Sequence, residues 1–225
     1  MIKAIIFDVD GVILESAEIK TRAFAELFAE YPDKLPELIA YHRKNAGLSR
    51  FVKFRYFYQK LLNEPLSARK EAELSQRFSQ IVLEKVLRAP ITRGASEFLR
   101  RHGGRYLFFI ASGVPEEELR GIIDQRGLGQ YFREVHGTPK LKDEIIADIL
   151  NRYSLKTGEA VYVGDAESDR AAAEKAGIPF VARLNNESPE LKKCRWKVND
   201  LTELDAILDN IESYQDKQQK GGDNR

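Results

Sequence analysis

The sequence predicts an α/β fold: a mostly parallel sheet flanked by helices, with an all-helical segment inserted after the first strand. From about residue 91 onward, short apolar runs of strand length alternate with amphipathic stretches of helical spacing. A similar apolar run, Ala4–Phe7, lies near the start of the chain. The roughly 75 residues between these two parts, from Glu15 to Pro90, carry helical patterns and no strand signal.

The first strand is expected at Ala4–Phe7, because this run is short and apolar, as buried parallel strands are. Asp8-Val9-Asp10-Gly11 follows it directly, and the alternation of a strand directs Asp8 and Asp10 the same way. Buried carboxylates are costly unless they are compensated. We therefore expect a divalent cation and a phosphate group at this strand end, where Gly11 allows the backbone to turn sharply.

The inserted segment is expected to form a helical bundle. Ser16 is a suitable N-cap for a first helix that ends at Tyr31-Pro32. Further helical patterns, with breaks at Gly47, Pro65 and Pro90, cover Leu35–Arg43, Leu48–Asn63 and Ser67–Leu87. Aromatic and leucine residues recur at helical spacing from Phe51 to Leu61, which predicts a buried stripe in preference to an aromatic substrate site.

The second part of the chain alternates regularly between helices and strands. Helices are expected at Gly94–His102, at Pro115–Arg126 with Pro115 as the first helical residue, at Lys142–Tyr153, at Ser168–Ala176 and at Leu201–Ile211. Strands are expected at Arg105–Ala111, Glu134–His136, Ala160–Val163 and Ile178–Ala182. The polar stretch Gln215–Arg225, with its paired glycines, is expected to be a frayed tail.

Bulk properties exclude several classes of function. The 225 residues carry 36 Lys and Arg against 35 Asp and Glu, so no global charge favours nucleic acid or an anionic membrane. No apolar run approaches the roughly 20 residues of a membrane helix, and no signal-peptide pattern precedes the first strand. The one cysteine, Cys194, fits a reducing compartment. We therefore expect a soluble cytoplasmic protein; no pattern indicates its oligomeric state.

Four polar signatures are expected at one edge of the sheet, because the carboxyl ends of parallel strands share that edge. They are Asp8–Gly11, Ser112-Gly113, the lysines before the helix at residue 142, and the acids Asp165 and Asp169. Taken singly, each has a structural interpretation as a turn, a helix-end acid or a solvated lysine. Together they supply a nucleophile, cation ligands, a hydroxyl with backbone N–H groups, and an ammonium, which phosphoryl transfer requires.

These four segments, in this order and with a helical insertion after the first, resemble the haloacid dehalogenase-like (HAD) hydrolase superfamily. The resemblance covers the core, and it is closest to the subgroup of phosphoglycolate phosphatases and β-phosphoglucomutases, which carries a helical cap after the first strand. It implies a Rossmann-like catalytic core of residues 1–14 and 91–213, a helical cap of residues 15–90 and a tail of residues 214–225. A cap of this kind implies a small phosphorylated metabolite as substrate and disfavours phosphoproteins.

The resemblance also implies roles for individual residues. Asp8 would be the nucleophile that forms an aspartyl-phosphate, and Asp10 the general acid and base, whose backbone carbonyl also contacts the metal. Ser112, the Gly113 N–H and the Gly11 turn would hold the phosphoryl group. The metal would be Mg²⁺, with Asp8, Asp10, Asp165 and Asp169 around it. Asp165 would be a direct ligand, and Asp169 would fix either the metal or the lysine.

Two further assignments, the catalytic lysine and the basic residues of the cap, leave an alternative open. Lys140 and Lys142 both precede the same helix, and the usual spacing of the family favours Lys142 as the catalytic lysine. Arg50 and Lys53 follow the glycine break in the cap and would share a helix face, so they are candidates to bind a second anionic group of the substrate, with solvated surface charge as the alternative. The three histidines, His42, His102 and His136, and Cys194 and Trp196 are interpreted as structural or surface residues.

The favoured function is a Mg²⁺-dependent phosphatase for a small phosphorylated metabolite. A phosphomutase of the β-phosphoglucomutase kind is an alternative, although Lys20 stands where that group would place a histidine. The dehalogenases and phosphonoacetaldehyde hydrolases of the superfamily lack an acid at the position of Asp10, which argues against both. A binding protein that kept the fold without the chemistry is the remaining alternative.

Overall fold

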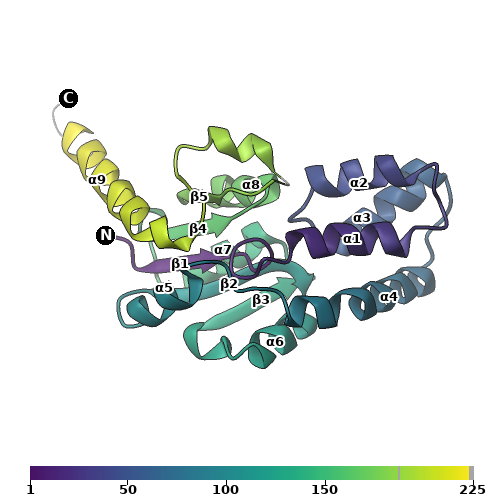
Figure 1. Ribbon diagram of the computed structural model, residues 1–225. Helices are drawn as coiled ribbons and strands as arrows, with labels where there is room; N and C mark the ends of the chain where they lie inside the picture. The colour runs from purple at the N-terminus through teal and green to yellow at the C-terminus, as the bar shows by residue number, and fades with distance from the viewer. Residues whose placement is uncertain (187, 223–225) are drawn as a thin grey trace.

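The computed structural model describes residues 1–186 and 188–222, and it contains the expected parallel sheet with helices on both faces (Figure 1). The six strands lie in the order β3-β2-β1-β4-β5-β6, and each neighbouring pair is parallel. Their bounds are β1 Ala4–Phe7, β2 Leu107–Pro115, β3 Glu134–Thr138, β4 Ala160–Gly164, β5 Phe180–Arg183 and β6 Lys197–Val198. This order brings the ends of β1, β2 and β4 side by side at the centre of the sheet.

Alternate residues of β1 face two separate hydrophobic layers. Ile5 and Phe7 pack on one face with residues of α5 (Ala95–His102), α6 (Glu116–Gln125) and α9 (Leu204–Gly222). Ala4 and Ile6 pack on the other face with residues of α7 (Lys142–Arg152) and α8 (Glu167–Ala176). Because both faces are covered, β1 is apolar along its whole length, as a central parallel strand must be.

The inserted helices lie beyond the carboxyl ends of the strands (Figure 1). They are α1 Ala17–Leu27, α2 Leu35–Lys44, α3 Arg50–Tyr56, the π-helix η1 Phe57–Leu62 and α4 Ala68–Leu87. Phe54, Phe57, Tyr58 and Leu61 are buried in this bundle, which confirms the predicted stripe, and Phe51 is partly buried against them. Aromatic burial of this kind holds short helices together when they are too short to be stable alone.

Several strand and helix boundaries differ from the predictions; the first helix, for example, ends at Leu27 and not at Tyr31-Pro32. β2 continues through Ser112-Gly113, beyond its expected end at Ala111, and Pro115 is its last residue and the N-cap of α6. The extension occurs because β3 also continues, and Pro115 pairs with Thr138. β5 begins at Phe180 and not at Ile178, because the Ile178 N–H donates to Ala173 O and completes the end of α8.

Two further differences lie near the C-terminus. β6 was not predicted, because two residues are too few to show strand alternation; it pairs with β5. α9 continues beyond Ile211 to Gly222 where we expected a frayed tail, and Tyr214 packs edge-on against Trp196 with the Arg195 guanidinium over its ring. Residues 223–225 of the expected tail lie outside the described residues.

Short 3-10 turns complete the connections: η2 Gly129–Tyr131, η3 Thr157–Glu159, η4 Pro189–Lys193 and η5 Leu201–Glu203. A search of the described residues finds no helix with the length and apolar character needed to span a membrane.

Candidate active site

The loop after β1 and the loop after β4 meet at the centre of the sheet edge. The Asp8 N–H donates to Val163 O at 2.9 Å, which fixes Asp8 beside the end of β4. Gly11 has φ +74°, and a Cβ there would overlap the Asp165 carboxylate. A glycine is therefore required at this position both for the backbone turn and for the close approach of the two loops.

Three buried carboxylates gather at this meeting point. Asp8, Asp165 and Asp169 each offer an oxygen atom, and these atoms lie within 4.8 Å of one another. All three residues are at most 3% exposed. Hard carboxylate oxygens in such a group are the donors that Mg²⁺ and similar cations prefer, so the residues present fit a divalent cation. Asp10 contributes no side-chain oxygen to this group.

Lys142 partly compensates the three carboxylates. Its Nζ lies 2.7 Å from Asp8 Oδ2 and 2.5 Å from Asp169 Oδ1. Burial opposes the charged form, but Asp169 and Asp8 raise the pKa of Lys142 above its ordinary value. One ammonium cannot balance three carboxylates. Burial raises the pKa of Asp8 to about 6, although the charge of Lys142 acts in the opposite direction. Burial, followed by the charges of Asp169 and Asp8, raises the pKa of Asp165 well above its ordinary range. The site therefore favours a further positive charge.

Of the two lysines that the sequence left open, Lys142 is the one at the carboxylates. Lys140 is largely exposed and pairs with Asp148 on the surface at 2.6 Å.

Replacing Lys142 with Met should leave buried carboxylates without their cation, and should lower the free energy of unfolding by about 3–5 kcal/mol in EDTA at pH 8. Urea denaturation measures this loss. Lys140→Met is the matched control and should unfold at the wild-type urea concentration; equal midpoints for the two variants would contradict the burial of this pair.

Two residues that the sequence analysis missed hold Asp165 and Asp169 in place. The hydroxyl of Tyr162, a buried residue of β4, lies 2.7 Å from Ala111 O and 3.2 Å from Asp169 Oδ1. Asn185, after β5, donates its Nδ2–H to Asp165 Oδ2 at 2.5 Å. A buried tyrosine needs a hydrogen-bond partner for its hydroxyl. The position of Tyr162 within the apolar run of β4 was therefore a signal present in the sequence. The loop of Asn185 gives no comparable signal.

Asp169 also accepts hydrogen bonds from the backbone at the start of α8. The N–H groups of Asp165 and Ala166 donate to Asp169 Oδ2 at 3.2 and 3.0 Å. Together with Lys142 and Tyr162, these donors occupy both oxygens of Asp169. Asp169 is therefore the most fixed of the three acids, and Asp8 and Asp165 face the cavity described below.

Asp10 lies beside the three carboxylates but is held by α1. Ser16 Oγ donates to Asp10 Oδ1 at 2.5 Å, and Lys20 Nζ lies 3.3 Å from Asp10 Oδ2. Ser16 is thus at the expected N-cap position, although its side chain serves Asp10 and not the helix. A carboxyl group in this place can exchange a proton with a ligand in the cavity.

The inserted helices close over the site through the loop between α2 and α3. A Cβ at Gly113 would lie 2.7 Å from Gly47 O, and a Cβ at Gly47 would lie 3.1 Å from Lys142 Nζ. Two glycines from distant parts of the chain thus allow this loop to touch the end of β2 and the catalytic lysine candidate. The contact restricts access of water to Asp8.

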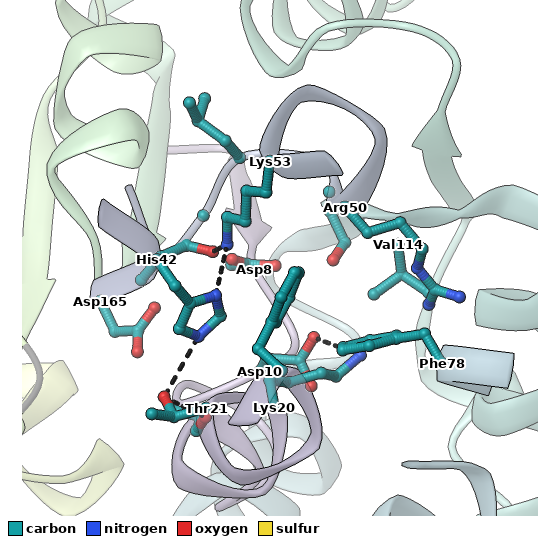
Figure 2. A pocket seen from close by; sticks show the side chains of 17 residues that line it. Asp8, Asp10, Lys20, Thr21, His42, Arg50, Lys53, Phe78, Val114 and Asp165 are labelled. Carbon is teal, nitrogen blue, oxygen red and sulfur yellow. Dashed lines mark hydrogen bonds and ion pairs between the residues drawn. The ribbon is translucent and has the colours of Figure 1, made fainter. Parts of the chain in front are cut away.

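A cavity of about 60 Å³ remains between the inserted helices and the sheet edge (Figure 2). Because a water molecule needs roughly 10–15 Å³ of such volume, the cavity has room for a small ligand. Predicted residues line it from both sides: Asp8, Asp10, Ser112, Gly113 and Asp165 from the sheet edge, and Arg50 and Lys53 from the inserted helices. Lys20 of α1 also lines it, although it was not a predicted site residue.

His42 also lines this cavity and is 3% exposed, so it belongs to the site region, which we had not expected. Burial, with the charges of Lys53, Lys20 and Arg43, lowers the pKa of His42 to about 2, so the imidazole is neutral. The other residues interpreted as structural or surface residues do not line the cavity: His102, His136, Cys194 and Trp196.

Comparisons with known proteins agree with this geometry. The family profile of haloacid dehalogenase-like hydrolases matches residues 2–177. A phosphoglycolate phosphatase from Rhodospirillum rubrum is 26% identical over 192 residues, which cover 80% of this chain and 79% of the relative. The β-phosphoglucomutase structure from Clostridium difficile superposes with a TM-score of 0.74 at 18% identity, covering 95% of this chain and 99% of the other. CbbY from Rhodobacter sphaeroides in complex with phosphate superposes with a TM-score of 0.73 at 18% identity, covering 93% and 100%.

Proposed function

The chain belongs to the haloacid dehalogenase-like hydrolase family, a phosphoric monoester hydrolase by its relatives, and we propose that it is a Mg²⁺-dependent phosphatase for a small phosphorylated metabolite. The observation that carries this proposal is the buried group of Asp8, Asp165 and Asp169 with Lys142 at the end of the central strands. A structural role would not need so much buried negative charge at one sheet edge.

Asp8 is the proposed nucleophile. Its carboxylate oxygen attacks the phosphorus atom, the bond between phosphorus and the ester oxygen breaks, and an aspartyl-phosphate forms on Asp8. Lys142 stabilises the ionised carboxylate, which it contacts at 2.7 Å. Asp8 and Asp165 would hold Mg²⁺, and the ion would supply positive charge that lets an anionic nucleophile approach an anionic phosphate.

Asp10 is the proposed acid and base. It gives its proton to the departing ester oxygen and then takes a proton from the water that attacks the aspartyl-phosphate. The hydrogen bond from Ser16 orients Asp10, and Lys20 lies close to its second oxygen. The release of inorganic phosphate restores free Asp8.

Ser112 and the backbone N–H of Gly113 are the proposed donors to the phosphoryl oxygens. Ser112 is buried, and both residues line the cavity at the end of β2. Donors fixed in the backbone of a strand need no rearrangement as charge develops on these oxygens. Gly11 lets the first loop pass directly beside the Asp165 carboxylate.

We further propose that residues 1–14 and 91–213 form the catalytic core and residues 15–90 a cap, with the loop of Gly47 as the part that covers the substrate. The contact of this loop with Gly113 supports that division. The single thiol, Cys194, supports a cytoplasmic location, since it has no second cysteine in the chain to form a disulfide.

A test of the proposed function separates hydrolysis from phosphoryl transfer. The purified protein is incubated with Mg²⁺ and a panel of phosphate monoesters that includes a sugar 1-phosphate, and free phosphate and sugar isomers are both measured. We expect free phosphate and no isomer. Formation of isomer would identify a phosphomutase, and no turnover of any ester with Mg²⁺ would identify a protein that binds without catalysis.

A further inference from the structure

We propose that Lys53 determines substrate specificity by pairing its buried ammonium with a second anionic group of the substrate, on the cap side of the cavity. This inference rests on the proposed phosphatase function and names the feature that would select one phosphate ester over another. Lys53 is 2% exposed, lines the cavity and comes from α3, whereas the phosphoryl-binding residues come from the sheet (Figure 2).

The other lysines and arginines near the cavity already have carboxylate partners. Lys20 pairs with Asp10 at 3.3 Å, and Lys142 pairs with Asp8 and Asp169. Lys53 differs, because no carboxylate of the described residues is its ion-pair partner; its Nζ donates to Ala46 O at 2.8 Å and to His42 Nδ1 at 3.2 Å. A buried ammonium without a counter-charge is costly, and an anionic ligand would remove that cost.

Arg50, the other candidate from the sequence, is engaged elsewhere. Its guanidinium pairs with Glu118 of α6 at 2.7 Å, donates to Ser79 Oγ of α4 at 2.6 Å, and lies 4.7 Å from the centre of the Phe78 ring. Burial raises the pKa of Glu118, but Arg50 outweighs it and holds that pKa below the usual value. Arg50 and Lys53 therefore do not act together as the sequence suggested; Arg50 joins the cap to the core, and Lys53 stays available to a ligand.

A chain of side chains orients the ammonium of Lys53. Because the imidazole of His42 is neutral, Nδ1 accepts from Lys53 and Nε2 carries the proton, which it donates to Thr21 Oγ1 at 3.1 Å. Thr21, His42 and Lys53 come from α1, α2 and α3, so this connection spans the cap. A neutral histidine orients the lysine without neutralising it, which leaves its charge for a ligand.

The electrostatic surroundings support an anionic ligand at this position. Burial, followed by the charges of Lys20 and Lys142, lowers the pKa of Lys53 to about 7, while Asp10 and Asp165 oppose this effect. The charges of the proposed catalytic lysine and of the nearby acids thus both act on Lys53. The small cavity, of about 60 Å³, favours a substrate whose second anionic group lies close to the phosphate ester.

The test compares esters of similar size that differ in charge at the end away from the phosphate: phosphoglycolate, ethyl phosphate and phosphoethanolamine. In the wild-type protein, kcat/KM should be highest for phosphoglycolate. Lys53→Met should lower the ratio of kcat/KM for phosphoglycolate to that for ethyl phosphate by about 10- to 100-fold, and should shift the ratio for phosphoethanolamine in the opposite direction. Lys60→Met, at an exposed lysine of η1, is the matched control and should leave both ratios unchanged.

Lys53→Gln guards against a purely structural effect, because the amide can still donate to Ala46 O but carries no charge. It should lower the same ratio as Lys53→Met does. A loss of selectivity in the Met variant alone, or an equal fall of kcat/KM for all three esters, would overturn the role of Lys53. If the wild-type protein hydrolyses none of the esters, the proposed phosphatase function itself is wrong, which is a different outcome.

Discussion

Replacing Asp8 with Asn abolishes phosphate release, with an expected fall in kcat of about 10⁴-fold or more. An amide oxygen is a poor nucleophile, and the covalent intermediate cannot form on it. Asn has almost the same size and can still accept the hydrogen bond from Val9 N that Asp8 Oδ1 accepts at 2.7 Å. A continuous assay of free phosphate with Mg²⁺ measures the loss. A variant with wild-type turnover would show that Asp8 is not the nucleophile.

The fold of this variant should remain intact. Burial raises the pKa of Asp8 in the folded protein to about 6, above the ordinary value of 3.8. A raised pKa means that folding favours the protonated acid, so above pH 6 the charged carboxylate opposes folding and the neutral amide does not. In EDTA at pH 8, Asp8→Asn should therefore unfold at a temperature equal to or above that of the wild type. Asp33→Asn, at an exposed acid, is the control for loss of charge alone.

Removing the divalent cation has the second large expected effect. EDTA should reduce phosphate release to background, and added Mg²⁺ should restore it, because the nucleophile and the phosphate are both anionic. The wild-type protein should also melt at a higher temperature with Mg²⁺, since an ion bound at 100 times its Kd stabilises the folded state by about 2.7 kcal/mol.

Asp165→Asn should remove both responses to the cation. The substitution takes one of the three carboxylates from the cluster, and Asn185, which contacts Asp165 Oδ2, stays in place beside it. We expect a loss of turnover of at least about 10²-fold and little change of melting temperature on adding Mg²⁺. Full turnover in EDTA, or a wild-type Mg²⁺ response in this variant, would contradict a metal role for Asp165.

The central strands and the residues at their ends could be predicted from sequence because the physical signal is local. A strand that is buried on both faces is an uninterrupted apolar run, as Ala4–Phe7 is, and the acids that follow such a run can only lie at the sheet edge. The joint position of Asp8 and Asp165 then follows from parallel topology. It did not require any knowledge of side-chain contacts.

Contacts between the cap and the core could not be predicted in the same way. The pattern placed Arg50 and Lys53 on one helix face, but their different partners, Glu118 on α6 and His42 on α2, depend on how separate helices pack. His42 gave no signal because a single buried histidine resembles any surface histidine in sequence. Close approach of two loops, such as that of Gly47 and Gly113, is likewise visible only in three dimensions.

The central claim is that Asp8 and Asp165 share one divalent cation. Anomalous diffraction from crystals grown with Mn²⁺, collected near the manganese edge, locates such an ion directly. We predict one strong anomalous peak within about 2.5 Å of a carboxylate oxygen of Asp8 and of Asp165. Crystals that hold Mn²⁺ at another place, or that show no peak between these two acids at millimolar Mn²⁺, would contradict it.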